Sequence, residues 1–310
     1  MLDVRRLRLL RELARLGTIA AVAEAMSYTP SAVSQQLSTL EREAGVPLVR
    51  RVGRRLMLTP AGAGLAARAE PVLALLEEAA AALAAESAEL AGELRIGAFP
   101  TAVRTLLPGA LVALGAQHPR LELRVTEIDP AQVPDALRTG SLDIALVHEY
   151  DYVPTGSDPA LETRPLLTET IFLASDRVLP DPADPVGQCA DLPWIAASPG
   201  TLCSLMTERL CQAAGFAPLV RHQADDFATV LALVAAGQGV ALVPELALAD
   251  RPDGLVLTPL AARRRTLIAC RAGSAGHPAI SACATSIRAA AAAYGGLTGQ
   301  RSSATPARPG

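Results

Sequence analysis

The sequence predicts an α/β protein in three parts, and three observations lead to this fold class. Residues 1–58 contain ten arginines against five acidic residues, although the whole chain carries a net charge of −3. Residues 60–91 are rich in alanine and leucine with the periodicity of one long helix. From residue 92 onward, short apolar runs alternate with helical patterns, as in α/β folds.

Three short helices are predicted in the arginine-rich part. The first spans residues 4–16 and the second residues 19–26, each with apolar residues on one face. Thr29 suits the N-cap of a helix and Pro30 suits its first position, so together they predict the start of a third helix. Gly45 ends it. Two helices joined by a tight turn predict a helix-turn-helix motif at about residues 18–37.

The outer face of the third predicted helix carries short polar side chains and no basic residue before Arg42. The major groove of DNA admits a helix, and hydroxyl and amide groups bind base edges there. An ordinary solvated amphipathic helix is the alternative. On the first interpretation, the side chains expected to read bases are Ser31, Ser34, Gln35, Gln36 and Ser38.

A two-stranded wing is predicted at residues 50–59, RRVGRRLMLT, with a turn at Gly53 and two arginines on each arm. Arginines of this kind hold phosphates, which position a protein on DNA without specifying its sequence. The residues expected to do so are Arg50, Arg51, Arg54 and Arg55.

A long helix is predicted over residues 60–91, started by Thr59 and Pro60. Its apolar residues follow the three- and four-residue spacing of a seam between two helices. Pro71 is expected to kink this helix or to divide it in two.

These features resemble the LysR-type transcriptional regulators. The resemblance rests on PSAVSQQLSTLE (30–41), the alanines of the second helix, Gly45 and LTPAG (58–62). Val49 departs from it, because the family usually has phenylalanine there. The resemblance implies a winged helix-turn-helix DNA-binding domain over 1–59, a dimerising linker helix over 60–91 and an effector-binding domain over 92–295.

The effector-binding domain of that family is two-lobed and similar to periplasmic binding proteins. The resemblance implies lobe I at about 92–163 and 266–295, and lobe II at about 164–265. Residues 296–310 are of low complexity and are expected to be disordered. The implied partners are double-stranded DNA with an inverted repeat, a small-molecule effector, and further copies of the chain in a dimer or tetramer. RNA polymerase is a further candidate partner.

Two predicted helices begin directly after strands, at Pro100 and at about Thr201. Helix N-termini at the carboxyl ends of strands attract anionic ligands, although the two threonines could simply be caps. A carboxylate is therefore one expected effector group, and nearby acids would favour an amine, so an amino acid is a further candidate. The residues expected at the effector site are Pro100, Thr101, His148, Ser198, Thr201 and Asp226.

The five cysteines show no CxxC spacing, which favours reduced thiols in a cytoplasmic protein. Cys203 and Cys211 lie near the reactive pair of the peroxide-sensing members of the family, so a redox-responsive regulator is the alternative function. Eight residues along an intact helix separate them by about 12 Å, and a disulfide would require unwinding. The alternative is that both cysteines are reduced thiols that pack as small apolar side chains in the core.

Enzymatic function is not expected. The chain contains no lysine, which excludes pyridoxal-phosphate enzymes and Walker-type nucleotide sites. The four histidines lack metal-ligand spacing and no GxSxG motif is present, so neither a cofactor nor a metal is expected. No signal peptide or membrane span is recognisable. The remaining rival is a solute-binding α/β protein that does not bind DNA.

Overall fold

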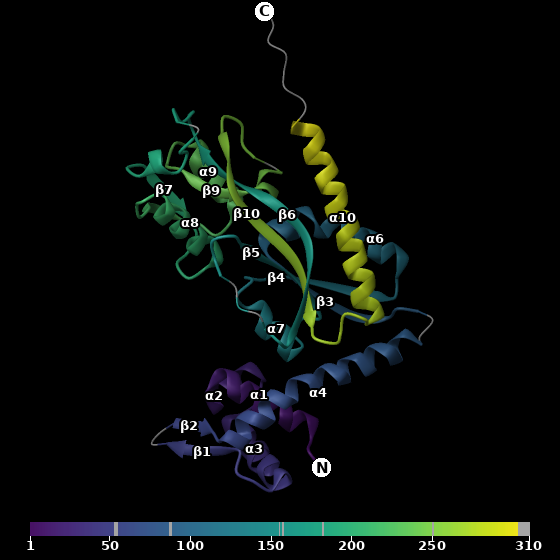
Figure 1. Ribbon diagram of the computed structural model, residues 1–310. Coiled ribbons are helices and arrows are strands. Elements are labelled where there is room, and N and C mark those ends of the chain that lie inside the picture. Colours follow the sequence, from purple (N-terminus) through teal and green to yellow (C-terminus); the bar gives the residue numbers. More distant parts are fainter. Residues whose placement is uncertain are drawn as a thin grey trace, which may run out of the picture.

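The computed structural model describes residues 1–302 except 53, 54, 87, 88, 155, 157, 182 and 250, and omits the side chains of 52, 55 and 295–302. Figure 1 shows an elongated molecule in which one long helix joins a small N-terminal domain to a larger α/β domain. Within the described residues, no helix has the length and apolar character needed to span a membrane.

The N-terminal domain contains the three predicted helices: α1 (Val4–Leu16), α2 (Ile19–Ala25) and α3 (Pro30–Ala44). The predicted caps of α3 are confirmed. The hydroxyl of Thr29 accepts from the amide of Ala32 at 3.2 Å, and Gly45 has the left-handed φ of 70°. Apolar side chains of all three helices share one core, which fixes the outer face of α3 toward solvent.

The wing is an antiparallel pair of strands, β1 (Val49–Val52) and β2 (Arg55–Leu58). It packs directly on α4 (Pro60–Ala85), since a Cβ at Gly62 would lie 2.0 Å from the carbonyl oxygen of Leu48. The prediction of a long helix is confirmed. Its division at Pro71 is wrong, because α4 runs through that residue as one element.

A six-stranded sheet forms the centre of the larger domain, in the order β4-β3-β5-β10-β6-β9. The first three strands are parallel, whereas β10 runs antiparallel to both of its neighbours. The strands are β3 (Gly92–Ala98), β4 (Leu121–Glu127), β5 (Ile144–Tyr150), β6 (Leu161–Ser175), β9 (Ala241–Pro244) and β10 (Val256–Arg271).

Strands β6 and β10 are much longer than the apolar runs in the sequence that lie within them, at about residues 171–176 and 266–273. Their other halves are only partly buried and carry polar residues, so they show no apolar run. They pair along nearly their whole length, from Val256 opposite Ser175 to Arg271 opposite Leu161. The two lobes are therefore joined by one continuous pair of strands.

Helices cover the sheet, with α10 and α6 side by side over lobe I (Figure 1). Lobe II adds the parallel strands β7 (Pro193–Ala196) and β8 (Leu219–Gln223), and a bridge from Trp194 to Val240 links β7 to β9. The helices of this domain are α5 (Pro100–Thr105), α6 (Leu107–Gln117), α7 (Val133–Thr139), α8 (Leu202–Ala213), α9 (Phe227–Ala235) and α10 (Pro278–Ser302).

Two helix predictions need correction. The helix predicted to begin at Pro100 is short, because it is broken at Leu106, where Pro108 disfavours a continuous helix through the residues before it. Helix α10 continues to Ser302 and so occupies part of the tail expected to be disordered. Residues 303–310 lie outside the described residues.

Candidate functional site

The outer face of α3 is polar and open to solvent. Its inner face buries Val33, Leu37 and Leu40 in the domain core. Gln36 differs from the other predicted reading residues, because it is half-buried and its Oε1 accepts from Nε of Arg6 at 2.8 Å. The exposed members of the predicted set are Ser31, Ser34, Gln35 and Ser38.

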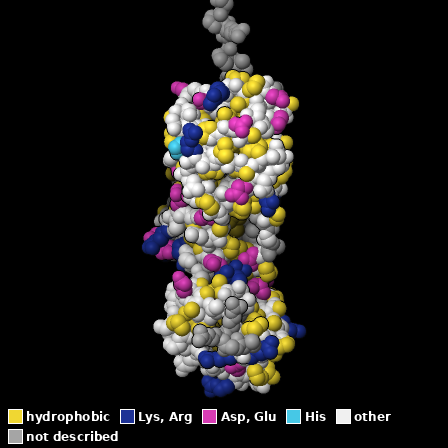
Figure 2. All heavy atoms as spheres, turned by 90° about the vertical axis from the view of Figure 1, so that its left-hand side faces the viewer, with side chains coloured by type: hydrophobic (Ala, Val, Ile, Leu, Met, Phe, Trp, Pro, Cys, Tyr) yellow, Lys and Arg dark blue, Asp and Glu magenta, His cyan; other side chains and the backbone are white. Residues whose placement is uncertain are grey.

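The wing places Arg50 and Arg51 in the exposed strand β1, beside α3 in Figure 1. Arg54 lies outside the described residues, and Arg55 begins β2 with a side chain that is not described. Arginine side chains gather at the end of the molecule formed by the N-terminal domain (Figure 2). This end therefore combines uncharged polar groups on a helix with cations on the neighbouring hairpin.

A cavity of about 280 Å³ lies in the larger domain, between the two lobes. It opens where β3, β4, β7 and β8 end, and β5 and β10 supply one wall. The residues that line it are Phe99, Pro100, Thr101, Glu127, Ile128, Asp129, Pro130, His148, Ala197, Thr201, Cys203, Asp225, Phe227 and Arg264.

Four of the six residues expected at the effector site line this cavity: Pro100, Thr101, His148 and Thr201. The two threonines differ in role. Thr201 caps α8, because its hydroxyl accepts from the amide of Ser204 at 3.2 Å. Thr101 caps nothing, since the cap position of α5 is Phe99, and its buried hydroxyl instead accepts from Arg264 at 3.2 Å.

Ser198 and Asp226 are not among the lining residues, and each has other contacts. The amide and hydroxyl of Ser198 donate to Asp225, both at 2.7 Å, which ties two loops of lobe II together. Asp226 caps α9 and pairs with Arg104 of α5 at 2.7 Å. Although burial opposes it, this arginine and two backbone amides lower the pKa of Asp226. The Arg104–Asp226 pair bridges the two lobes.

A buried ion pair lies at the base of the cavity. The guanidinium of Arg264, 1% exposed, donates to Glu169 at 3.0 and 3.1 Å and lies 4.9 Å from the ring centre of Phe99. Burial raises the pKa of Glu169, and the charge of Arg264 opposes this change. Separating the two side chains would leave an uncompensated buried charge, which is energetically costly. The ion pair therefore holds β10 against β6 at this point.

His148 is buried between the rings of Phe99 and Tyr150, with ring centres 4.8 and 5.1 Å away. Neither of its ring nitrogens has a hydrogen-bond partner among the residues that the structure describes. Burial lowers the pKa of His148 well below its ordinary value of 6.5, and the nearby charge of Arg264 lowers it further. His148 is therefore a neutral imidazole in the cavity wall, and its buried donor and acceptor nitrogens both lack a partner among the described residues.

The two cysteines of α8 lie in different environments. Cys203 lines the cavity, with its sulfur 3.3 Å from the hydroxyl oxygen of Tyr150. Burial raises the pKa of the Cys203 thiol, against the opposing effects of that hydrogen bond and of Arg264. Cys211 is fully buried in the lobe II core, and burial raises its pKa to about 12. Both are free thiols.

Sequence reasoning missed Arg264, which is the most buried charge of the site. It is the middle residue of the run Arg263-Arg264-Arg265, which suggests a solvated charge cluster. In β10, residues alternate between buried and more exposed positions, and this alternation turns only the middle arginine inward. The alternation with a period of two residues in PLAARRRTLI (259–268) was the signal that could have identified Arg264.

Comparisons with known proteins agree with both ends of the molecule. Residues 4–63 match the family model described as "Bacterial regulatory helix-turn-helix protein, lysR family". Residues 87–292, most of the rest of the chain, match the model "LysR substrate binding domain". The match at residues 4–63 removes the rival interpretation, a solute-binding protein with an incidental basic segment.

Individual relatives are similar to this chain over most of their length. A "Probable hydrogen peroxide-inducible genes activator" of Streptomyces viridosporus is 34% identical over 292 residues, covering 85% of this chain and 89% of its own. The "Transcriptional dual regulator GltC" of Bacillus subtilis is 28% identical over 253 residues, covering 80% and 83%.

Among solved structures, the Corynebacterium glutamicum OxyR C206 mutant is 25% identical with a TM-score of 0.57, covering 96% of this chain and 95% of that one. The similarity to this structure thus extends over the N-terminal domain, the long helix and the larger domain together. The chain belongs to the LysR family of DNA-binding transcriptional regulators, proteins without enzymatic activity whose second domain binds an effector.

Proposed function

We propose that this regulator acts as a homo-oligomer on an inverted-repeat operator and responds to a small amphoteric molecule, such as an amino acid, bound between its lobes. The observation that carries the effector proposal is His148, whose two unpaired ring nitrogens are buried in the cavity wall. Buried polar atoms without a partner cost free energy, and a ligand with polar groups would satisfy them.

The charges of the lining support an amphoteric ligand. Arg264 is already paired with Glu169, whereas Glu127, Asp129 and Asp225 bring three further carboxylates to the cavity. These carboxylates favour an amine on the ligand. The hydroxyl of Thr101 accepts from Arg264 and keeps its proton for an anionic group of the ligand. A cavity of about 280 Å³ suits a small metabolite.

A thermal-shift and calorimetric screen of amino acids, small carboxylates and small amines tests this proposal on the full-length protein. We expect an amino acid to bind, and His148→Phe to weaken it about tenfold or more, the loss expected for a buried hydrogen bond. Binding only of simple dicarboxylates, or equal affinity in His148→Phe, would contradict the proposed ligand class.

On the DNA side, we propose that α3 reads bases through Ser31, Ser34, Gln35 and Ser38, and that the wing arginines hold phosphates. The exposure of these side chains and the absence of charge from that face of α3 support this division. Phosphate contacts should also give a steep dependence of affinity on salt concentration. Free cysteines are consistent with our expectation that the protein acts in the cytoplasm.

We propose that the C-terminal half of α4 forms the dimer contact. Four large apolar side chains are exposed there, Val72, Leu75, Leu76 and Leu83, the last at 76%. A row of this kind fits a second copy of the same helix. Sedimentation of Leu76→Glu/Leu83→Glu should show a smaller species than the wild type, and an unchanged mass would exclude α4 as the contact.

A second candidate function is a redox-responsive regulator, favoured by the place of Cys203 in the cavity and by relatives named as peroxide-inducible activators. The raised pKa of its thiol and the burial of Cys211 disfavour thiolate chemistry in this conformation. Mass spectrometry of free thiols after peroxide treatment distinguishes the two functions. Unchanged peroxide dependence of DNA binding in Cys203→Ser/Cys211→Ser would exclude the redox candidate.

A further inference from the structure

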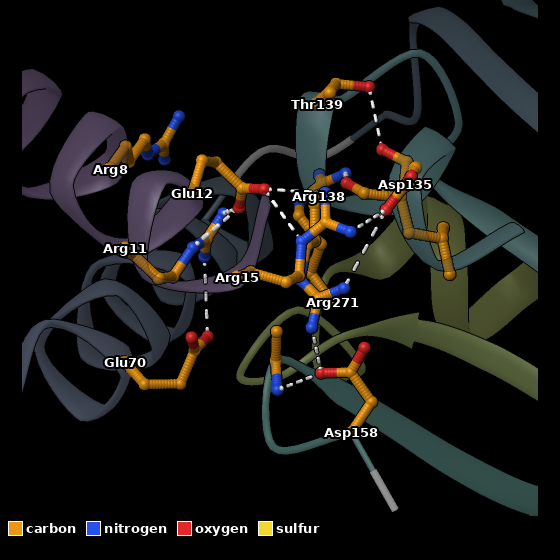
Figure 3. A network of polar contacts seen from close by, with 12 residues as sticks. Arg8, Arg11, Glu12, Arg15, Glu70, Asp135, Arg138, Thr139, Asp158 and Arg271 are labelled. Atoms are coloured by element: carbon orange, nitrogen blue, oxygen red, sulfur yellow. Dashed lines mark hydrogen bonds and ion pairs between the residues drawn. The ribbon is translucent and has the colours of Figure 1, made fainter. Parts of the chain in front are cut away.

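A network of charged side chains joins the N-terminal domain to the effector domain of the same chain (Figure 3). Its centre is Glu12 of α1, which is fully buried and is held by two guanidiniums. Arg11 approaches it at 2.7 Å and Arg15 at 2.8 Å. Arg11 also reaches Glu70 of α4 at 3.4 Å, so this part of the network holds α1 on the linker helix.

Arg15 extends the network across the domain boundary. Its Nη1, which does not contact Glu12, pairs with Asp135 of α7 at 2.7 Å, as Figure 3 shows. The side chain of Arg15 is thus held at one end by Glu12 and at the other by the effector domain. A guanidinium with its planar set of donors suits such a two-sided contact better than a lysine would.

A second set of contacts supports the first on the neighbouring face of α4. Glu77 lies between Arg8 at 3.4 Å and Arg271, the last residue of β10, at 3.3 Å. Arg271 also donates to the carbonyl oxygen of Leu137 in the last turn of α7 at 3.2 Å and to that of Leu142, after the helix, at 2.9 Å. The position of α7 is therefore tied to the linker helix as well as to α1.

Helix α7 leads directly from the cavity to this boundary. The segment 127–130 lines the cavity, and α7 begins at Val133. The turn between them is hydrogen-bonded, from Gln132 to the carbonyl of Asp129 at 2.9 Å and from Val133 to that of Pro130 at 3.3 Å. A displacement of the cavity wall would thus move the start of α7.

Within the N-terminal domain, α1 is in turn connected to α3. Helix α1 shares the core of the N-terminal domain with α3. Arg6 of α1 donates to Gln36 of α3 at 2.8 Å and also pairs with Glu43 near the end of that helix. A change in the position of α1 would therefore reach the helix that faces DNA through short, specific contacts.

We propose that α7 couples the cavity to the DNA-binding domain of its own chain, and that the Asp135–Arg15 pair carries this coupling. The inference rests on the proposed function only in treating the cavity as the effector site. A molecule that shifts segment 127–130 moves Asp135, and the pair transmits that shift to α1 and α3. The bound molecule changes DNA binding only to the extent that it binds more tightly to one position of α7 than to another.

The test uses hydrogen exchange of the full-length protein, with Ala197→Phe filling the cavity in place of an unidentified effector. We expect exchange in segment 127–133 and in α1 to change by about threefold or more, the order expected of a partly exposed ion pair. In Ala197→Phe/Asp135→Asn, the change in 127–133 should remain and the change in α1 should disappear.

The matched control is Ala197→Phe/Glu122→Gln, which removes an exposed carboxylate paired with Arg124 elsewhere on the same domain. It should respond in α1 as Ala197→Phe does. An α1 response that survives Asp135→Asn would overturn the proposal. So would a 127–133 segment that responds to neither Ala197→Phe nor Ala197→Leu. Neither result depends on the ligand screen, so failure of the effector proposal would be seen separately.

Discussion

The face of α3 and the interlobe cavity place their functional side chains in opposite ways. The exposed polar residues of α3 lie within one helix and within eight positions of sequence, and they contribute little to the core. The cavity collects side chains from six strands and their loops, and several of them are buried in the same cores that hold the lobes together. A change on α3 should therefore alter binding without altering stability, whereas a change in the cavity should alter both.

The largest expected effect is that of Arg264→Met. It leaves Glu169 buried without its cation, and we expect the unfolding free energy to fall by about 3–5 kcal/mol in chemical denaturation. Arg265→Met is the matched control. The side chain of Arg265 is 43% exposed, so this substitution should lower the unfolding free energy by about 1 kcal/mol or less. If Arg264→Met/Glu169→Leu were no more stable than the single variant, the unpaired charge would not be the cause.

The pH dependence of stability gives the next largest effect. His148 has a pKa well below 6.5 in the folded protein, so the unfolded chain binds the extra proton as the pH falls. The contribution of His148 is fully present above pH 6.5 and is lost below it, by about 1.4 kcal/mol per pH unit. Between pH 7.5 and 5.5 the unfolding free energy from denaturation curves should fall by about 1.4 kcal/mol in total, and this fall should be absent in His148→Phe. An equal slope in both proteins would contradict the assignment.

Gln35→Ala probes the other region. We expect it to relax preference at one base pair by about 1–3 kcal/mol, while the unfolding free energy changes by about 0.5 kcal/mol or less. Gln36→Ala is the informative control, because its side chain is engaged by Arg6. Affinities for duplexes with single base changes measure both. Equal losses on operator and random DNA for Gln35→Ala would remove it from the reading set.

Arg51→Ala is expected to have the smallest effect. It removes one phosphate contact, so it should weaken binding to every sequence alike and reduce the slope of affinity against salt by about one unit. Titrations of labelled duplex at several salt concentrations measure this. Arg120→Ala, at an exposed pair with Glu89 on the effector domain, should keep the wild-type slope. A loss confined to one sequence would show that Arg51 reads bases.

Local sequence signals were enough to predict the N-terminal domain and the long helix that follows it. Each signal there is local: Thr29 and Pro30 start α3, Gly45 ends it, and the three-to-four-residue spacing of apolar residues leaves the polar face outside. Because one helix contains the whole face, no contact distant in sequence was needed to identify it. The long helix α4 followed from the same kind of pattern, although its continuity through Pro71 did not.

The cavity and its connection to α1 depend on contacts that form only when the chain is folded. Loop positions and helix starts located Pro100, Thr101, His148 and Thr201, but the contacts of Ser198 and Asp226 with Asp225 and Arg104 depend on residues far away in sequence. Arg264 is separated from Glu169 by 95 residues, and Arg15 is farther still from Asp135. Local periodicity shows whether a side chain is turned inward. Only the packing of the lobes and of the two domains determines which group it meets there.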